Sequence, residues 1–225
     1  MTGFTEATFR VLGELAANNN KEWYDANKDR LKKDARDPFE AMLGIVTVLL
    51  EGSQYPVQGN AKTMFRQNRD VRFSKDKTPY KTTVSGMLTP SGIKDESNGV
   101  VYAQVGPDGG LIAAGHYRLA TADLNLVRDH ILANPDHFTQ IRADLRHKGW
   151  ELRTENRLSG MARGYSDHVD HPLVDALRLK TYTVLANQRQ QVWINGDIVE
   201  NLVALAEDIG PLLAFIRDGL SRAPK

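Results

Sequence analysis

Cysteine is absent from the 225-residue chain, and its absence excludes disulfides, thiolate metal sites, iron–sulfur clusters and cysteine nucleophiles. Long apolar runs are also missing. The longest covers residues 41–50 and includes Thr47, so it is too short to span a bilayer. The first ten residues contain no apolar segment of the kind that a secretory signal requires. We therefore expect a soluble, cytoplasmic protein that does not enter a membrane.

An excess of one charge is missing too, because 29 lysine and arginine residues nearly balance 28 aspartate and glutamate residues. The net charge of +1 predicts no general attraction of the whole chain to nucleic acid or to a membrane surface. Apolar residues make up 41% and charged residues 25% of the chain, an ordinary globular composition that excludes a disordered protein. At this length, one domain can bury a core without disulfides or metals.

Four familiar motifs of catalysis and nucleotide binding do not occur: G-x-x-x-x-G-K-[ST], G-x-G-x-x-G, H-E-x-x-H and G-x-S-x-G. The glycine-rich stretch 106–110 joins two predicted strands and does not open a helix, so we interpret it as a hairpin turn and not as a phosphate-binding loop. The sequence therefore predicts no cofactor and leaves open whether the protein is an enzyme.

Helices are predicted in residues 5–51. Thr5 and Asn20 are suited to cap the first two, because their side chains can accept a hydrogen bond from a backbone N–H in the first turn. Pro38 predicts the start of a third helix, since proline lacks an N–H that the first turn does not use. Gly52 is expected to end this helix.

Strands are predicted in the central part of the chain, residues 64–117. Residues 84–88 and 100–105 are expected to form strands, and the second of these alternates apolar residues with others as a half-buried strand does. The turn at 106–110 then leads into the apolar residues 111–114, a pattern that predicts an antiparallel hairpin.

Residues 121–220 are predicted to form further helices, with one more strand at 181–185. Thr121 and Asn134-Pro135 indicate two helix starts, residues 150–153 a short edge strand, and Gly210-Pro211 a break or kink in the last helix. We predict an α+β fold, in which a single domain of residues 1–225 packs helices around a mostly antiparallel sheet.

Positive charge is concentrated in residues 66–81, which hold six cationic and two acidic residues and therefore a net charge of +4. The other residues include 23 cationic and 26 acidic ones, a net charge of −3. The six cations are Arg66, Arg69, Arg72, Lys75, Lys77 and Lys81, and the two acids are Asp70 and Asp76. A short cationic segment on an acidic protein suits a small anion or a short stretch of phosphate backbone better than a long duplex.

Pro79 and the Ser, Asp and Thr residues before it favour turns, so this segment is not a simple helix. If the beginning of the segment is extended, Phe65 and Phe73 share one side and can face the core. Arginine can bind a carboxylate or a phosphate with two parallel hydrogen bonds, and lysine adds a mobile point charge. Such a gathering of cations is repulsive unless anions neutralise it.

Three interpretations of these cations stay open. In the first, they bind a small phosphate- or carboxylate-bearing ligand; in the second, they bind the phosphates of nucleic acid; in the third, they form a structural ion-pair network without a ligand. If the protein is an enzyme, Asp76, Tyr80 or His116 would carry the proton. The predicted ligand-binding residues are Arg66, Arg69, Arg72, Lys75, Lys77, Tyr80, Lys81, His116, Arg163 and Tyr165, with Asp70 and Asp76 orienting the cations.

Histidines offer weaker signals. His116 follows a glycine at the end of a predicted strand, where a side chain can face a pocket, although a partly buried histidine bonded to a backbone carbonyl fits the same pattern. Asp167, His168, Asp170 and His171 have side chains that can bind a divalent metal. A solvated turn ahead of a helix explains the same four residues, so we predict no metal site while leaving this group open.

The string RDVRFSKDKTPYKT, residues 69–82, closely resembles the signature of the domain of unknown function 2461 family, uncharacterised conserved proteins of bacteria and fungi. Ala162-Arg163 stands where the family pattern has Pro-Lys, which keeps the cation and loses the rigid turn residue. The resemblance covers nearly the whole chain and implies one fold, but no activity, substrate or cofactor. Other similar parts are Asn18, Asn19, Trp23, Tyr24 and Asn27, then Ala114-Gly115-His116-Tyr117, and finally Gly164-Tyr165 with His171-Pro172.

Overall fold

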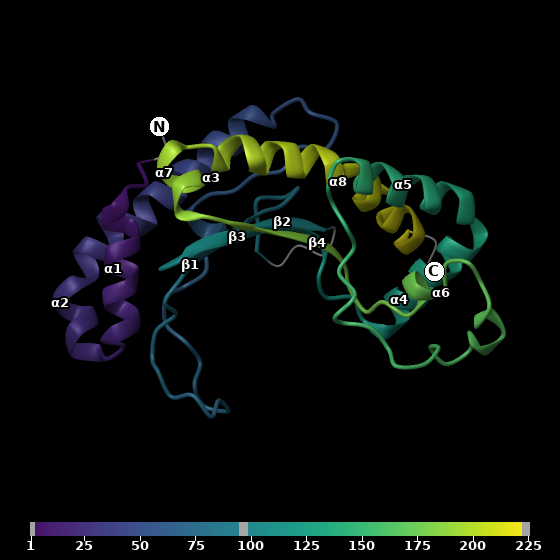
Figure 1. The fold of residues 1–225 in the computed structure, drawn as a ribbon, viewed down its shortest axis with the longest axis horizontal. Coiled ribbons are helices and arrows are strands. Elements are labelled where there is room, and N and C mark those ends of the chain that lie inside the picture. Colours follow the sequence, from purple (N-terminus) through teal and green to yellow (C-terminus); the bar gives the residue numbers. More distant parts are fainter. Residues whose placement is uncertain (1–2, 95–98, 222–225) are drawn as a thin grey trace.

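A computed structural model describes residues 3–94 and 99–221 of the chain, and it has the α+β architecture that the sequence predicts (Figure 1). Helices come first, three strands follow, and helices return around a fourth strand. The helices are α1 (Glu6–Ala17), α2 (Lys21–Leu31), α3 (Asp37–Leu49), α4 (Thr121–Ala133), α5 (Pro135–His147), α6 (Val174–Leu177), α7 (Gln190–Asn195) and α8 (Ile198–Leu220). The strands are β1 (Val84–Leu88), β2 (Val100–Gly106), β3 (Gly109–His116) and β4 (Tyr182–Gln188).

The four strands form one antiparallel sheet in the order β1-β2-β3-β4. The predicted hairpin is confirmed, because Gly106 pairs with Gly109 across a two-residue turn. Gly109 has a φ of 121°, in the region where a side chain would strain the backbone. Strand β1 coincides with the predicted range 84–88, and β4 starts one residue later than predicted and runs three residues further.

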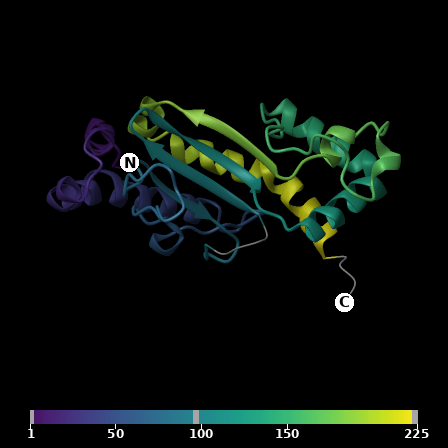
Figure 2. The same cartoon turned by 90° about the horizontal axis from the view of Figure 1, so that it is seen from below.

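Helices cover one face of this sheet. Val101, Ala103 and Val105 of β2 are buried, and α3, α7 and α8 lie on their side of the sheet (Figures 1 and 2). The residues that alternate with them, Tyr102 and Gln104, are only partly buried. They face the side on which Figure 1 shows loops and no helix directly across the sheet. The core therefore lies between the sheet and the helices, and the other face of the sheet stays open.

The helix predicted to start at Pro38 begins earlier, because α2 runs into α3 through a π-helical turn, Lys32–Arg36. In this turn the Asp37 N–H donates to the Lys32 carbonyl five residues back. The wider turn places Pro38, which has no N–H to donate, inside a continuous helical segment without ending it. The caps predicted at Thr5 and Asn20 are confirmed, since both side chains accept backbone N–H groups.

Two other predictions need correction. Of the break or kink predicted at Gly210-Pro211, the break does not occur, because α8 continues through Pro211 to Leu220. A Cβ atom at Gly210 would overlap the ring of Tyr55, so this glycine allows the ring to pack closely against α8. Residues 150–153 do not form a strand, and the bond from Arg153 N to Thr183 O, at 2.9 Å, joins them to β4. Among the described residues, no helix is both long and apolar enough to cross a bilayer.

Candidate anion-binding site

Residues 66–81, here named the basic loop, form a long excursion that leaves the sheet beside β1 and returns to it (Figure 1). Backbone hydrogen bonds between its two ends close its base, as in a β-hairpin. The Lys81 N–H donates to Gln67 O at 2.8 Å, and the Arg69 N–H donates to Pro79 O at 2.8 Å. The buried Gln67 side chain donates to Lys81 O and to Thr83 O. The loop is therefore anchored at its base through its own backbone.

Tyr80 fixes the loop to the N-terminal helices. The Asn19 side chain bonds its backbone in both directions, donating to Tyr80 O at 2.9 Å and accepting from Tyr80 N at 3.1 Å. The Tyr80 ring is stacked on Tyr24, with centroids 3.9 Å apart and planes within 7° of parallel. Tyr80 is buried. It was predicted as a ligand-binding residue, and the structure places it in an anchoring position.

Arg69 and Asp76 lock the two sides of the basic loop together. The guanidinium Nη1 lies 2.5 Å from Asp76 Oδ2 and donates to Thr78 O at 3.0 Å. Asp76 in turn accepts the Thr78 N–H at 2.9 Å and the Thr78 hydroxyl at 2.8 Å. Hydrogen bonds from Thr78, and then the one from Arg69, lower the pKa of Asp76 to about 2. The charge of Arg69 is thus neutralised inside the loop.

Two further cations of the basic loop also have partners within it. Arg72 binds Asp70 through two parallel bonds, Nε to Oδ1 at 3.0 Å and Nη2 to Oδ2 at 2.7 Å, and this pairing lowers the pKa of Asp70. Lys77 Nζ donates to Val71 O at 2.9 Å. For these side chains the local geometry is that of the structural network that the sequence left as an alternative. Lys75 is exposed at the far end of the loop.

Phe73 lies at the tip of the basic loop and is 94% exposed. The prediction that Phe65 and Phe73 face the core is therefore wrong: Phe73 is exposed, and the ring of Phe65 lies near Tyr102, on the face of the sheet away from the core. A turn at residues 72–73 breaks the extended backbone, so strand parity no longer decides where the Phe73 ring points. The guanidinium carbon of Arg72 lies 5.8 Å from the centroid of the Phe73 ring.

Three cations at the base of the loop have no such neutralisation: Arg66, Lys81 and Lys94, here named the basic cluster. Within the part of the chain that the structure describes, none of them is within ion-pair distance of a carboxylate. Partial burial, followed by repulsion from Arg66 and Lys94, lowers the pKa of the Lys81 ammonium. These like charges are therefore close enough to disfavour one another.

The ring of Phe65 organises the basic cluster. Lys81 Nζ lies 5.1 Å and Lys94 Nζ 5.9 Å from its centroid, both within the range of a cation–π contact. Phe65 is held beside β1, because its N–H donates to Ser85 O at 2.8 Å. Its ring centroid is 6.2 Å from that of Tyr102 on the open face of the sheet. The cluster therefore stands next to an aromatic surface.

The sequence did not predict Lys94, Phe65 or Tyr102 as site residues. Lys94 follows β1 and lies outside the basic segment, and it comes near because its Nζ donates to Met64 O at 3.0 Å. That contact depends on the pairing of Met64 with Gly86 of β1, which no local pattern reveals. A signal was available for Tyr102, because its position in the alternating strand places it opposite the buried residues of β2.

The structure does not bring His116, Arg163 and Tyr165 to the basic loop. His116 is buried at the far end of β3, six residues beyond Gly110, which is the β3 residue in line with Val84 of β1. Six strand residues span about 20 Å. Arg163 is exposed and Tyr165 buried in the segment before α6, on the opposite side of the molecule from the loop (Figures 1 and 2). The expectation of one shared pocket is therefore corrected.

Tyr165 belongs to a second arrangement, around α4. Its hydroxyl lies 2.6 Å from Asp129 Oδ1 and 3.0 Å from Asn125 O, and burial and the bond to Asp129 raise its pKa. Its ring lies 5.8 Å from the guanidinium carbon of Arg128. Arg128 is buried and donates to Leu177 O at 2.7 Å and Leu179 O at 3.2 Å. These contacts tie α4 to the segment before β4.

The Asp167, His168, Asp170 and His171 group forms part of a turn. His171 Nδ1 accepts the Leu173 N–H at 3.1 Å, and the rings of the two histidines are 6.2 Å apart. In the described parts of the chain, no three or more His, Cys, Asp or Glu side chains are placed to hold a metal ion.

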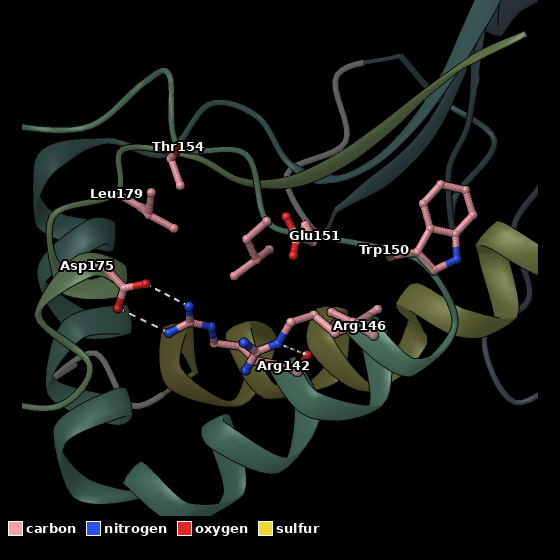
Figure 3. A pocket seen from close by; sticks show the side chains of 9 residues that line it. Arg142, Arg146, Trp150, Glu151, Thr154, Asp175 and Leu179 are labelled. Atoms are coloured by element: carbon pink, nitrogen blue, oxygen red, sulfur yellow. Dashed lines mark hydrogen bonds and ion pairs between the residues drawn. The ribbon is translucent and has the colours of Figure 1, made fainter.

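A cavity of about 130 Å³ lies between α5 and the segments at 150–154 and 175–179. Figure 3 shows Arg142 paired with Asp175 there, at 3.1 and 2.6 Å, and Arg146 Nε directed to Arg142 O at 3.3 Å. The charge of Arg142 is thus neutralised. None of the predicted ligand-binding residues lines this cavity.

Comparison with known proteins agrees with the resemblance seen in the sequence. A family model described as a conserved hypothetical protein (DUF2461) matches residues 7–215, nearly the whole chain. No curated protein and no solved structure matches it. The family description gives no reaction, so a functional argument has to start from the side chains themselves.

Proposed function

Since the chain belongs to the DUF2461 family of conserved hypothetical proteins, whose description gives no activity, we propose from the geometry that it recognises a small anionic ligand at the basic cluster. The ligand carries a phosphate or a carboxylate. Arg66, Lys81 and Lys94 supply the positive charge, and the basic loop holds the first two in place. The cations of the loop that carboxylates neutralise, Arg69 and Arg72, serve its architecture. Lys77, like Lys94, donates to a backbone carbonyl, and that bond does not neutralise its charge.

The observation that carries the proposal is that carboxylates neutralise some cations of this region and not others. Asp70 and Asp76 form ion pairs with Arg72 and Arg69, whereas no carboxylate of the described residues lies within ion-pair distance of the basic cluster. Arg66 feels the charge of Asp70 only at longer range. The repulsion felt by Lys81 is a cost that the folded protein bears when no anion is present. An anion placed between these side chains would remove that cost and add charge-assisted hydrogen bonds.

The surroundings of the cluster indicate which anions fit. Phe65 and Tyr102 provide an apolar surface beside the three charges, and the Tyr102 hydroxyl is 2.8 Å from Gln104 Oε1. A ligand with an anionic group and a flat or apolar part can use both features. The contact of Phe65 with Tyr102 places this aromatic surface on the face of the sheet opposite the buried residues of β2.

Calorimetric titration with inorganic phosphate and with citrate tests the proposal. Lys81→Gln and Arg66→Gln should each weaken binding by about tenfold, the effect of one lost charge-assisted hydrogen bond. Lys180→Gln is the matched control, because this exposed lysine lies before β4 and outside the basic cluster, and it should leave the affinity unchanged. Absence of binding for both anions, or equal weakening by the control, would refute the proposal.

A further inference from the structure

The tip of the basic loop has no role in binding a small anion at its base, although its shape is closely defined. Phe73 is the most exposed large apolar side chain among the described residues, and Arg72, Lys75 and Lys77 flank it. Figure 1 shows the loop extending away from the helices and the sheet. Within residues 3–94 and 99–221, this ring lies near the guanidinium of Arg72, and it is 94% exposed.

The loop keeps Phe73 in solvent by its own internal bonds. Arg69, Asp76 and Thr78 join its two sides, the Arg72 N–H donates to Asp70 Oδ1 at 3.2 Å, and Lys77 binds the Val71 carbonyl. A loop with this many internal bonds loses little conformational freedom when a partner binds. Its exposed ring therefore offers binding energy at low entropic cost.

We infer that the anion recognised at the basic cluster is a phosphate of a single-stranded nucleic acid, and that Phe73 stacks on one of its bases. This inference rests on the proposed function and specifies its ligand. Cations occur at both ends of the loop, Lys75 at the tip and Lys81 at the base, so a phosphate backbone can follow it. Aromatic stacking beside a positively charged track is how proteins hold unpaired strands without reading their sequence.

The charge distribution favours a short single strand over a duplex or a membrane surface. The chain outside the loop is net acidic, which disfavours a long polyanion lying across the whole molecule. In a duplex the bases are already stacked and their faces are hidden from Phe73. A membrane surface would need a larger apolar area than one ring, because a single buried side chain is too weak an anchor in a bilayer.

Fluorescence anisotropy with a labelled single-stranded DNA of about twelve nucleotides tests the inference, at low and at moderate salt. Phe73→Ala should weaken binding by about tenfold or more, while Phe73→Trp should retain it. Thermal unfolding should be the same for both variants, because the side chain packs against nothing that holds the fold. Lys75→Gln should reduce the slope of log affinity against log salt by about 0.7.

Phosphate titration of the same variants separates this inference from the proposed function. Phe73→Ala should bind inorganic phosphate as the unmodified protein does, and Lys81→Gln should weaken the binding of both phosphate and DNA. If phosphate binds but DNA binding is absent or is unchanged in Phe73→Ala, the inference fails and the proposed function stands. Binding of anionic phospholipid vesicles that depends on Phe73, without binding of DNA, would also overturn it.

Discussion

Arg128 and Lys81 are both cations with no carboxylate within ion-pair distance among the described residues, yet their surroundings differ completely. Arg128 is 2% exposed, and its guanidinium donates to Leu177 O, Leu179 O and the Asn125 side chain. Lys81 is half-buried and is repelled by the charges of Arg66 and Lys94. Arg128 therefore donates to oxygen atoms of the protein, whereas Lys81 is repelled by two other cations.

The comparison shows that a missing carboxylate does not by itself indicate a binding site. A guanidinium can be satisfied by carbonyl oxygens, and Arg128 then connects α4 to the chain before β4 as a structural element. What distinguishes the basic cluster is that mutual repulsion remains after folding. If the distinction is sound, substitutions at Arg128 should affect stability and substitutions in the cluster should affect binding.

The largest effect is expected for Arg128→Met. The substitution leaves the carbonyl groups of Leu177 and Leu179 buried without donors, so the free energy of unfolding should fall by about 3 kcal/mol. Urea denaturation measures this change in the free energy of unfolding. Arg146→Met is the control for loss of charge, because Arg146 is an exposed arginine on α5. A loss below about 1 kcal/mol would contradict the structural role of Arg128.

A smaller loss of stability is expected for Tyr165→Phe, which removes the hydroxyl bonded to Asp129 and Asn125. The free energy of unfolding should fall by about 1 kcal/mol. Phosphate affinity should not change, because Tyr165 lies on the opposite side of the molecule from the basic cluster. If Tyr165→Phe changes the phosphate affinity and leaves the stability unchanged, Tyr165 is a ligand-binding residue after all.

Lys81→Met should change stability least, and in the opposite direction. Removing one of three like charges relieves repulsion, so the free energy of unfolding should stay the same or rise by about 0.5 kcal/mol. Urea denaturation at low salt detects this difference best, because salt screens the repulsion. A clear loss of stability would mean that Lys81 has acceptors in the protein, as Arg128 does.

The bonds of Asp76 to Arg69 and Thr78, which join the two sides of the basic loop, should weaken in acid. The pKa of Asp76 in the folded protein, about 2, is below its ordinary value of 3.8. The bonds to Arg69 and Thr78 therefore contribute fully above pH 3.8, and their contribution is lost as the pH falls through about 2. NMR titration of the Asp76 carboxylate should give this low midpoint in the unmodified protein and a higher one in Arg69→Gln. If Asp76 titrates with the same midpoint in both proteins, Arg69 does not contribute to the low pKa of Asp76.

Much of the fold could be predicted because periodicity and turn chemistry are local signals. The alternation in residues 100–105 and the glycines at 106–110 fix the hairpin β2–β3, and Thr5 and Asn20 cap the helices they precede. The π-helical turn before Pro38 could not be predicted. Its wide turn depends on how α2 and α3 pack, and the proline alone indicates a helix start.

The candidate site was predicted only in part, because charge density does not reveal which cations are paired. Spacing identified residues 66–81, but the pairing of Arg69 with Asp76 depends on where the loop turns back. Lys94 joins the basic cluster through the contact of Met64 with β1, a long-range pairing. Tyr165 was grouped with the loop, whereas tertiary packing places it against α4.

The most direct measurement is the pKa of the Lys81 side chain, followed by NMR of selectively labelled lysine with and without phosphate. Because partial burial, and then repulsion from Arg66 and Lys94, lowers this pKa in the folded protein, it should lie below the ordinary value of 10.5 without an anion. Bound phosphate favours the charged form, so saturating phosphate should raise the pKa, and binding below that pH should be stronger than above it. A pKa at the ordinary value that phosphate leaves unchanged would contradict an anion site at the basic cluster.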